Sequence, residues 1–211
     1  MFIFGHIGIT IGVGMLIEAI TNHQHTKERI QQSESDYSTG QVVKGVTNSR
    51  VYKPNIIPVG KWLDYRLLVL ASMLPDIIDK PMGQVFLKDT FNYGRIYGHT
   101  LVFVLITGIL GMWVFKKWGK GWLLIMAFGS FMHDMEDQSW RWPQVLLWPL
   151  KGWGFPKEDL NAWLSGVYRA IVTEPDVFIP ELVGIVILAL AAIRVFRNRR
   201  FQYALKTGHI N

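Results

Sequence analysis

The 211-residue sequence contains no cysteine, which excludes a disulfide scaffold, a cysteine-ligated zinc site and a thiol nucleophile. Charged residues are also scarce: they make up 18% of the chain, against roughly 25% in soluble proteins. The net charge of +6 comes with no recognisable nucleic-acid motif and no basic face interleaved with aromatics, so we expect no nucleic-acid partner. The chain is long enough for one domain.

Five long apolar runs alternate with charge-rich stretches, a pattern typical of membrane proteins. We expect an all-α, polytopic membrane bundle of about five transmembrane helices, with residues 1–211 forming a single membrane domain. The second and fourth runs are shorter than the roughly 20 residues that cross a bilayer, so they are short helices or end inside the protein. The first lacks a basic leader and a small-residue cleavage site, so we interpret it as a retained helix rather than a signal peptide. The five runs are Phe2–Ile20, Trp62–Ile78, Thr100–Phe115, Gly121–Met132 and Phe178–Phe196.

The positions of the basic residues predict the orientation in the membrane. With five spans, segments 21–66, 116–120 and 194–211 lie on one side, and they hold 15 of the 22 lysines and arginines. Cytoplasmic loops are rich in these residues, so we predict an external N-terminus and a cytoplasmic C-terminus. Residues 21–61 would then be a polar cytoplasmic loop, and the basic face would contact anionic lipid headgroups. We expect the cytoplasmic (inner) membrane of a bacterium or archaeon.

Histidines and carboxylates gather at the predicted external ends of four of these runs. The lysines and arginines alone predict that orientation, so the clustering is an independent observation. Asp76 and Asp79 are three positions apart, and His133 and Asp137 are four apart, so each pair shares a helix face. Charged groups near a bilayer usually face the protein interior and indicate function. The residues in this set are His6, Asp76, Asp79, His99, His133, Asp134 and Asp137.

Imidazole and carboxylate donors together suit one or two divalent metal ions, with Zn²⁺ preferred over Mn²⁺ or Fe²⁺. Simpler interpretations stay open for several residues taken singly. His6 could be an interfacial histidine, Asp79 could pair with Lys80, and His133 with Asp137 could be a structural pair. Asp134 and Glu136 could face water, or Asp134 could orient a ligand. His23 and His25 fall on the cytoplasmic side and are expected to be solvated.

The chain resembles a family of membrane-bound metal-dependent hydrolases typified by the LexA-regulated inner-membrane protein of enterobacteria. Four pieces within residues 1–160 carry the resemblance, and H-x-x-x-D followed by tryptophan and W-P-L is the most specific. The pieces are Gly5-His6, LPDIIDKP (74–81), GRIYGHTLVF (94–103) and SFMHDMEDQSWRWPQVLLWPLKGWGF (130–155). The family is distantly similar to zinc-dependent phospholipases C and single-strand nucleases.

By this resemblance the metal ligands are His6, Asp76 or Asp79, His99, His133 and Asp137. Two departures bear on the number of ions. Gly94 stands where many relatives have a histidine, and no second H-x-x-x-E/D pair follows Asp137. The resemblance therefore implies a mononuclear or dinuclear centre rather than a trinuclear one.

These residues predict hydrolysis of a phosphoester or a lipid-linked substrate at the outer membrane face. Arg95 would contact a phosphate or pair with a carboxylate, and Asp79 or Asp134 would act as a base or orient a ligand. Residues 138–177, rich in tryptophan and proline, are predicted to form an interfacial cap over the site, or only an anchor.

Two other functions are alternatives to a hydrolase. One is a non-catalytic accessory protein with a structural metal site, in a complex or homo-oligomer, and the other is an ion transporter. The transporter is disfavoured because no run carries acids through its middle.

Overall fold

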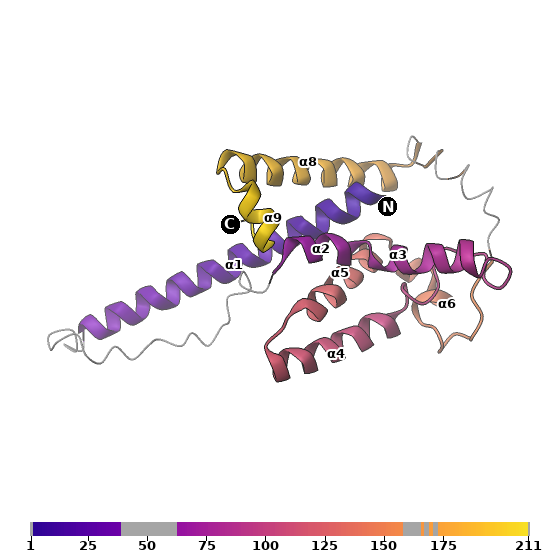
Figure 1. Cartoon of the computed structure of the whole chain (residues 1–211), viewed down its shortest axis with the longest axis horizontal. Coiled ribbons are helices and arrows are strands. Elements are labelled where there is room, and N and C mark those ends of the chain that lie inside the picture. Colours follow the sequence, from indigo (N-terminus) through magenta and orange to yellow (C-terminus); the bar gives the residue numbers. More distant parts are fainter. Residues whose placement is uncertain (1, 39–62, 158–165, 167–168, 171–172, 211) are drawn as a thin grey trace.

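The computed structural model describes residues 2–38, 63–157, 166, 169–170 and 173–210, and within these ranges every regular element is a helix. The predicted all-α class is therefore confirmed for this part of the chain (Figure 1). The helices are α1 (Ile3–Ser38), α2 (Tyr65–Ser72), α3 (Leu74–Pro81), the π-helical turn η3 (Met82–Phe86), α4 (Leu101–Trp118), α5 (Trp122–Glu136), the 3₁₀ turn η4 (Ser139–Arg141), α6 (Pro143–Leu146), α8 (Pro175–Arg197) and α9 (Phe201–Thr207).

Three described helices are long and apolar enough to cross a membrane: residues 3–28 of α1, all of α4 and all of α8. The chain is therefore a helical membrane protein. The second predicted run is divided at Met73 into α2 and α3, and the fourth forms α5, with 15 residues. A straight crossing takes about 20 residues, so these two runs are too short to span alone and instead pack against the longer helices.

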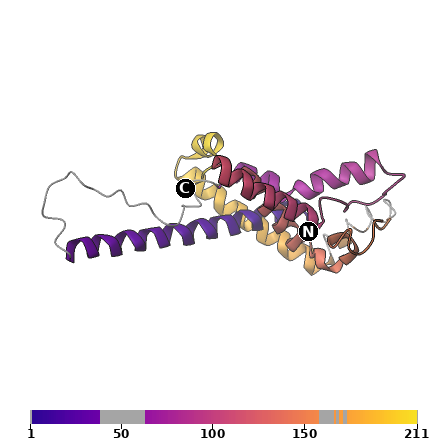
Figure 2. The same cartoon turned by 90° about the horizontal axis from the view of Figure 1, so that it is seen from below.

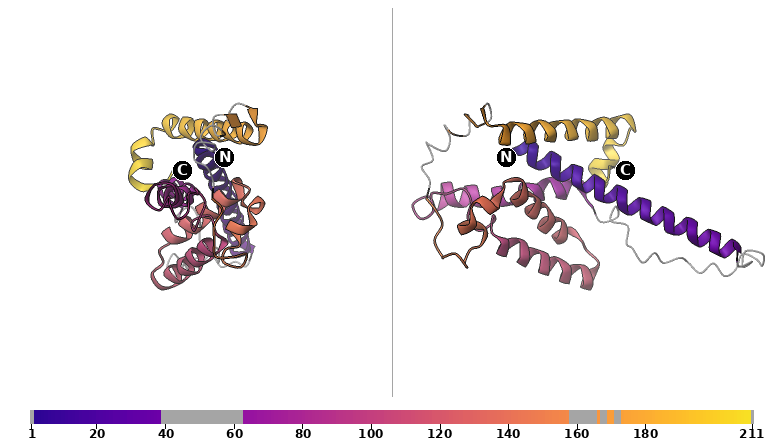
Figure 3. Two further views of the ribbon diagram at one scale, coloured as in Figure 1. Left: turned by 90° about the vertical axis from the view of Figure 1, so that its right-hand side faces the viewer. Right: turned by 180° about the vertical axis from the view of Figure 1, so that it is seen from behind.

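The five apolar segments alternate in direction. The start of α8 lies beside the start of α1, where the Phe2 amide donates to Glu181 at 2.6 Å. The end of α2 lies beside the end of α5, where His133 Nδ1 lies 2.7 Å from the Ser72 carbonyl oxygen. Because α4 and α5 form an antiparallel hairpin, α4 also begins at this end. One end of the bundle thus collects the starts of α1, α4 and α8 and the ends of α2 and α5 (Figures 1 and 3).

The α4–α5 hairpin has clear local causes. The Thr100 hydroxyl accepts from the Phe103 amide at 3.1 Å and caps α4. Gly119 ends α4 in the left-handed conformation at φ 67°, which glycine adopts without steric cost. These two caps fix His99 just outside one end of the hairpin and bring α5 back to the same level.

Small residues let the helices approach closely, as is usual between membrane helices. A Cβ atom on Gly8 would collide with the backbone of Gly184, so only glycine fits where α1 crosses α8. A Cβ atom on Gly129 would collide with Ala71 where α5 crosses α2. In the end-on view of Figure 3, α8 lies on one side, α4 on the other, and α1 between them.

The structure differs from the sequence prediction over residues 21–38, which continue α1 as a helix instead of starting a loop. The stretch is polar but contains good helix formers such as Lys27 and Glu28, and such residues lose little freedom in a helix. The Thr21 and Thr26 hydroxyls also bond to carbonyls one turn back. The lone projecting end of α1 is seen in Figure 2. The rest of the predicted loop, 39–61, lies outside the described residues.

The predicted cap is partly described. Its first part folds into η4 and α6, and an aromatic cluster holds it to the loop before α4: Tyr97 lies 5.3 Å from Trp148 and 5.1 Å from Phe155 between ring centroids. Its last residues, 175–177, belong to α8. Residues 158–165, 167–168 and 171–172 of the cap lie outside the described part.

Candidate metal centre

His99 is fixed by Asp79 from the end of α3. Both side chains are fully buried, and His99 Nδ1 lies 2.7 Å from Asp79 Oδ2. The same carboxylate accepts the backbone amides of Ile96, Gly98 and His99 at 2.7 to 3.2 Å. Asp79 therefore organises the loop before α4 and turns Nε2 of His99 away from itself. A carboxylate behind a histidine in this manner commonly orients metal-binding imidazoles.

The other two buried histidines are held by Nδ1 in the same way. His133 donates from Nδ1 to the Ser72 carbonyl oxygen at 2.7 Å, which ties α5 to the end of α2. His6 Nδ1 lies 2.8 Å from Glu136 Oε2, and Thr10 donates to the other oxygen of Glu136 at 3.1 Å. Each ring thus has Nδ1 occupied and leaves Nε2 to face the centre of the cluster.

The Nε2 atoms and two carboxylates converge in two overlapping groups that share His133. One group contains His6, His133 and Asp137, the other Asp76, His99 and His133, and the donor atoms within each lie within 4.8 Å of one another. The rings of His6 and His133 are stacked with their centroids 4.0 Å apart. The donors come from α1, α3, α5, the loop before α4 and the residue after α5.

The arrangement of protons supports a cation at this point. His99 Nε2 and His133 Nε2 lie 3.3 Å apart, and both rings already donate from Nδ1. In neutral rings, two lone pairs would then face each other in a buried space. Among the described residues, buried His6 Nε2 also has no hydrogen-bond partner, and it lies 3.2 Å from Asp137 Oδ1. A divalent cation satisfies all these donors, and three imidazoles with carboxylates form a donor set suited to Zn²⁺.

Each carboxylate of the cluster is balanced by one basic side chain. Asp76 presents Oδ1 to His99 Nε2 at 3.6 Å, while its Oδ2 pairs with Lys80 Nζ at 2.6 Å. Asp137 Oδ2 pairs with the Arg95 guanidinium at 2.6 Å. Burial would raise the pKa of Asp137, but the close approach of the His6 ring and the Arg95 charge outweigh it and hold the pKa well below its usual range. Asp137 therefore stays ionised.

Arg95 lies at the rim of the cluster rather than inside it. Its side chain is 31% exposed, and its guanidinium carbon lies 5.8 Å from the ring centroid of Trp142 in the cap. The guanidinium thus connects a buried carboxylate with the aromatic cap and keeps part of its surface accessible. Arginine in such a position suits phosphate or carboxylate recognition.

The structure brings five residues predicted as ligands into one cluster: His6, Asp76, His99, His133 and Asp137. It also separates the two aspartates that spacing alone left equivalent, because Asp76 faces the imidazoles while Asp79 supports one of them from behind. Arg95, predicted to contact a phosphate or pair with a carboxylate, pairs with Asp137 rather than Asp79.

Two acidic residues of α5 fall outside the donor groups. Asp134 is 2% exposed, and its Oδ1 accepts a long 3.4 Å hydrogen bond from Ser139. Its Oδ2 is buried and has no hydrogen-bond partner within the part of the chain that the structure describes. Glu136, interpreted from sequence as facing water, instead holds His6. One sequence signal points to this role of Glu136. Thr10 lies one turn after His6, so the two side chains share a face of α1, and both can form a hydrogen bond with a carboxylate.

The fold and the cluster define a helical membrane protein with a buried histidine–carboxylate centre near one end of its bundle. The model of the YdjM inner membrane protein family matches residues 1–201, and the chain belongs to this family. No curated protein and no solved structure matches the chain. Family membership thus establishes an inner membrane protein and leaves the chemistry to be argued from the site.

Proposed function

We propose that the chain is a membrane-embedded, metal-dependent hydrolase that acts on a phosphoester or lipid-linked substrate at the outer face of the membrane. The observation that carries this proposal is the orientation of three buried imidazoles by Nδ1, which directs three Nε2 atoms toward Asp76 and Asp137. When bound, a divalent metal there supplies Lewis acidity and a more acidic water molecule. His6, His99, His133, Asp76 and Asp137 would hold one or two such ions.

The other residues of the site have separable roles in this proposal. Arg95 would contact the negative charge of the substrate from the rim, since Asp137 and Trp142 already hold its guanidinium in place. Asp79 and Glu136 would position His99 and His6. Asp79 and Asp134 are the two candidates for a general base. Because Asp134 keeps a buried oxygen with no hydrogen-bond partner among the described residues, it is the candidate proton acceptor.

The external position of the site rests on the separation of charges. The cluster lies at the end where α4 starts, whereas Lys116 and Lys117 lie at the opposite end of α4, and Arg194 and Arg197 at the opposite end of α8. If basic termini are cytoplasmic, the cluster faces outward. The aromatic cap over this end would sit at headgroup level, where a lipid-linked substrate presents its ester.

Complete burial of the three histidines also favours a second function. Structural metal sites are closed, whereas catalytic ones keep an open position. His99 and His133 are fully buried and His6 is 1% exposed, so the centre would also suit an accessory membrane protein stabilised by a structural ion.

An activity measurement separates the two functions. The purified full-length protein, loaded in turn with Zn²⁺, Mn²⁺ and Fe²⁺, is assayed in micelles on bis(p-nitrophenyl) phosphate and on a mixed phospholipid extract. We expect metal-dependent hydrolysis that Arg95→Gln weakens without loss of metal. Stoichiometric metal without hydrolysis in any of these assays would favour the structural site and overturn the enzymatic proposal.

A further inference from the structure

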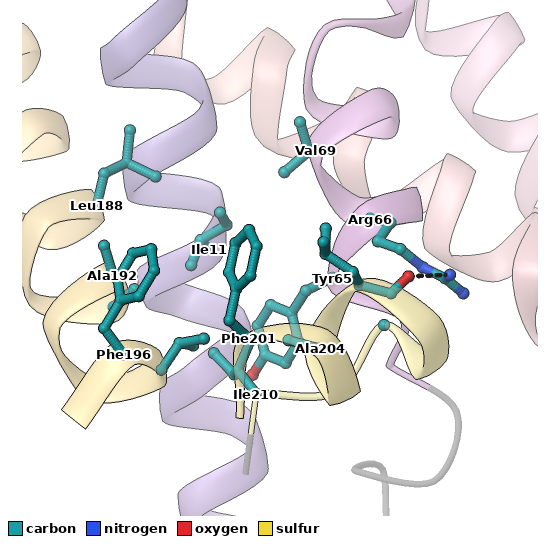
Figure 4. A pocket seen from close by; sticks show the side chains of 14 residues that line it. Ile11, Tyr65, Arg66, Val69, Leu188, Ala192, Phe196, Phe201, Ala204 and Ile210 are labelled. Atoms are coloured by element: carbon teal, nitrogen blue, oxygen red, sulfur yellow. Dashed lines mark hydrogen bonds between the residues drawn. The ribbon is translucent and has the colours of Figure 1, made fainter. Parts of the chain in front are cut away.

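An apolar cavity that is open to its surroundings lies toward the end of the bundle away from the metal centre, between α1, α2, α8 and α9 (Figure 4). Its volume is about 290 Å³. Ile11 of α1 and Leu188 of α8 lie on its inner side, and Phe201 and Ala204 of α9 form its outer wall. An apolar cavity of this kind does not hold water well and favours apolar occupants.

Polar contacts between residues at the edge of the cavity hold its outer wall in place. The Arg66 guanidinium donates to the carbonyl oxygens of Leu205 and Lys206 at 2.8 and 3.2 Å and pairs with Asp64 at 2.7 Å. The Tyr65 amide donates to the Gly208 carbonyl oxygen at 2.8 Å. These contacts fasten the end of α9 to the start of α2.

Three arginines stand in the chain between two residues that line the cavity. Phe196 in the last turn of α8 and Phe201 at the start of α9 both line the cavity, and Arg197, Arg199 and Arg200 (the arginine turn) lie between them in the chain. All three arginines are exposed, and within the described part of the chain none of them forms an ion pair. The arginine turn therefore offers charge to a partner outside the protein.

We propose that this cavity and the arginine turn form a binding site for one anionic phospholipid, with an acyl chain in the cavity and the phosphate against the arginines. The ligand comes from the bilayer, because the last turns of α8, a candidate membrane span, line this open cavity. Basic pockets between transmembrane helices bind anionic headgroups in this way. The site is remote from the metal centre and independent of the hydrolase proposal.

The test uses the full-length protein in nanodiscs that contain dioleoylphosphatidylglycerol and dioleoylphosphatidylcholine in equal amounts, followed by native mass spectrometry of the released protein. The two lipids share acyl chains, so preference reports the headgroup. We expect retained phosphatidylglycerol to exceed phosphatidylcholine. The double variant Arg197→Gln/Arg200→Gln should reduce this preference about fivefold for each charge removed.

Two further variants keep the result interpretable. Ala204→Phe fills the cavity but keeps every arginine, and it should reduce retention of both lipids. Lys116→Gln/Lys117→Gln removes two charges at the same end of the bundle, at the end of α4 and away from the cavity, and should leave the preference unchanged. Equal retention of the two lipids by the wild type would overturn the proposal. The proposal would also be overturned if Lys116→Gln/Lys117→Gln lost as much of the preference for phosphatidylglycerol as the arginine double variant. Retention of a second copy of the chain in place of lipid would overturn it as well.

Discussion

At the scale of single residues, the site depends on which nitrogen of each histidine is free. Asp79, Glu136 and the Ser72 carbonyl oxygen each accept from an Nδ1 atom, and this leaves the Nε2 atoms for the centre. Supports of this kind contribute as strongly to a metal site as some direct ligands. The structure thus shows which residues orient the histidines, and the spacing of candidate ligands in the sequence does not identify them.

The first prediction concerns one of these supports. Glu136→Gln keeps the shape of the side chain but weakens its hold on His6, so we expect divalent metal affinity to fall about 10- to 100-fold while the fold is kept. Competition with a chromophoric chelator measures the affinity. Glu174→Gln, on an exposed acid at the start of α8, is the matched control. Equal affinities for Glu136→Gln and the wild type would show that His6 needs no such support.

The second prediction separates substrate contact from metal binding. Arg95→Gln removes the charge at the rim while leaving the five candidate ligands in place. We expect unchanged metal content and a raised KM for anionic substrates, with a smaller effect on kcat. Lys157→Gln, an exposed cation in the same region, serves for comparison. A proportional loss of metal and activity would instead assign Arg95 to holding Asp137.

How far the sequence predicts the site can be seen in two pairs. His133 and Asp137 share a helix face at four-residue spacing, and the structure places both in the cluster. Asp76 and Asp79 are equally plausible by spacing. Their roles differ because the loop at 96–99 folds its amides onto Asp79, and that long-range contact has no local signature. Glu136 was missed for a related reason: its partner is 130 residues away.

At the scale of helices, the apolar runs predicted where helices form but not how each would end. The composition of residues 21–38 suggested a loop, yet the helix continues, because polarity alone does not stop a helix when its residues are good helix formers. The break at Met73 between α2 and α3 has a sequence signal in Pro75. Proline suits the first turn of a new helix, and α3 begins there.

The third prediction concerns the crossing of α1 and α8. Gly8→Leu places a side chain where the Gly184 backbone lies, so the helices must separate. We expect a loss of about 1–3 kcal/mol in unfolding free energy, as found for overpacked cores. Gly154→Ala is the control, because nothing lies within 4 Å of its added Cβ atom. Thermal unfolding in micelles measures the stability of both variants. An unfolding midpoint for Gly8→Leu equal to that of the wild type and of Gly154→Ala would contradict the described crossing.

At the scale of the whole molecule, the alternating helices separate two functional ends. One end holds the histidine–carboxylate cluster and the aromatic cap, and the other holds the apolar cavity and the basic ends of α4 and α8. The start of α1 and the end of α8 lie at opposite ends of the bundle, because both helices start at the end that holds the cluster. An external start of α1 therefore predicts a cytoplasmic end of α8.

The fourth prediction tests this orientation. An alkaline phosphatase fused after Asn211 should be inactive and a green fluorescent reporter at the same position should fluoresce, because phosphatase needs an oxidising exterior and the C-terminus is predicted to be cytoplasmic. The reverse pair of results would place the basic end outside and the metal centre inside.

The most direct test of the central claim is the metal content of the purified full-length protein, measured by inductively coupled plasma mass spectrometry. We predict one or two divalent ions per chain in the wild type and in His23→Ala, whose histidine is exposed on α1 away from the cluster. His133→Ala, which removes the donor common to both groups, should lose them. A metal-free wild type, or the same content in His133→Ala as in the wild type, would contradict the account.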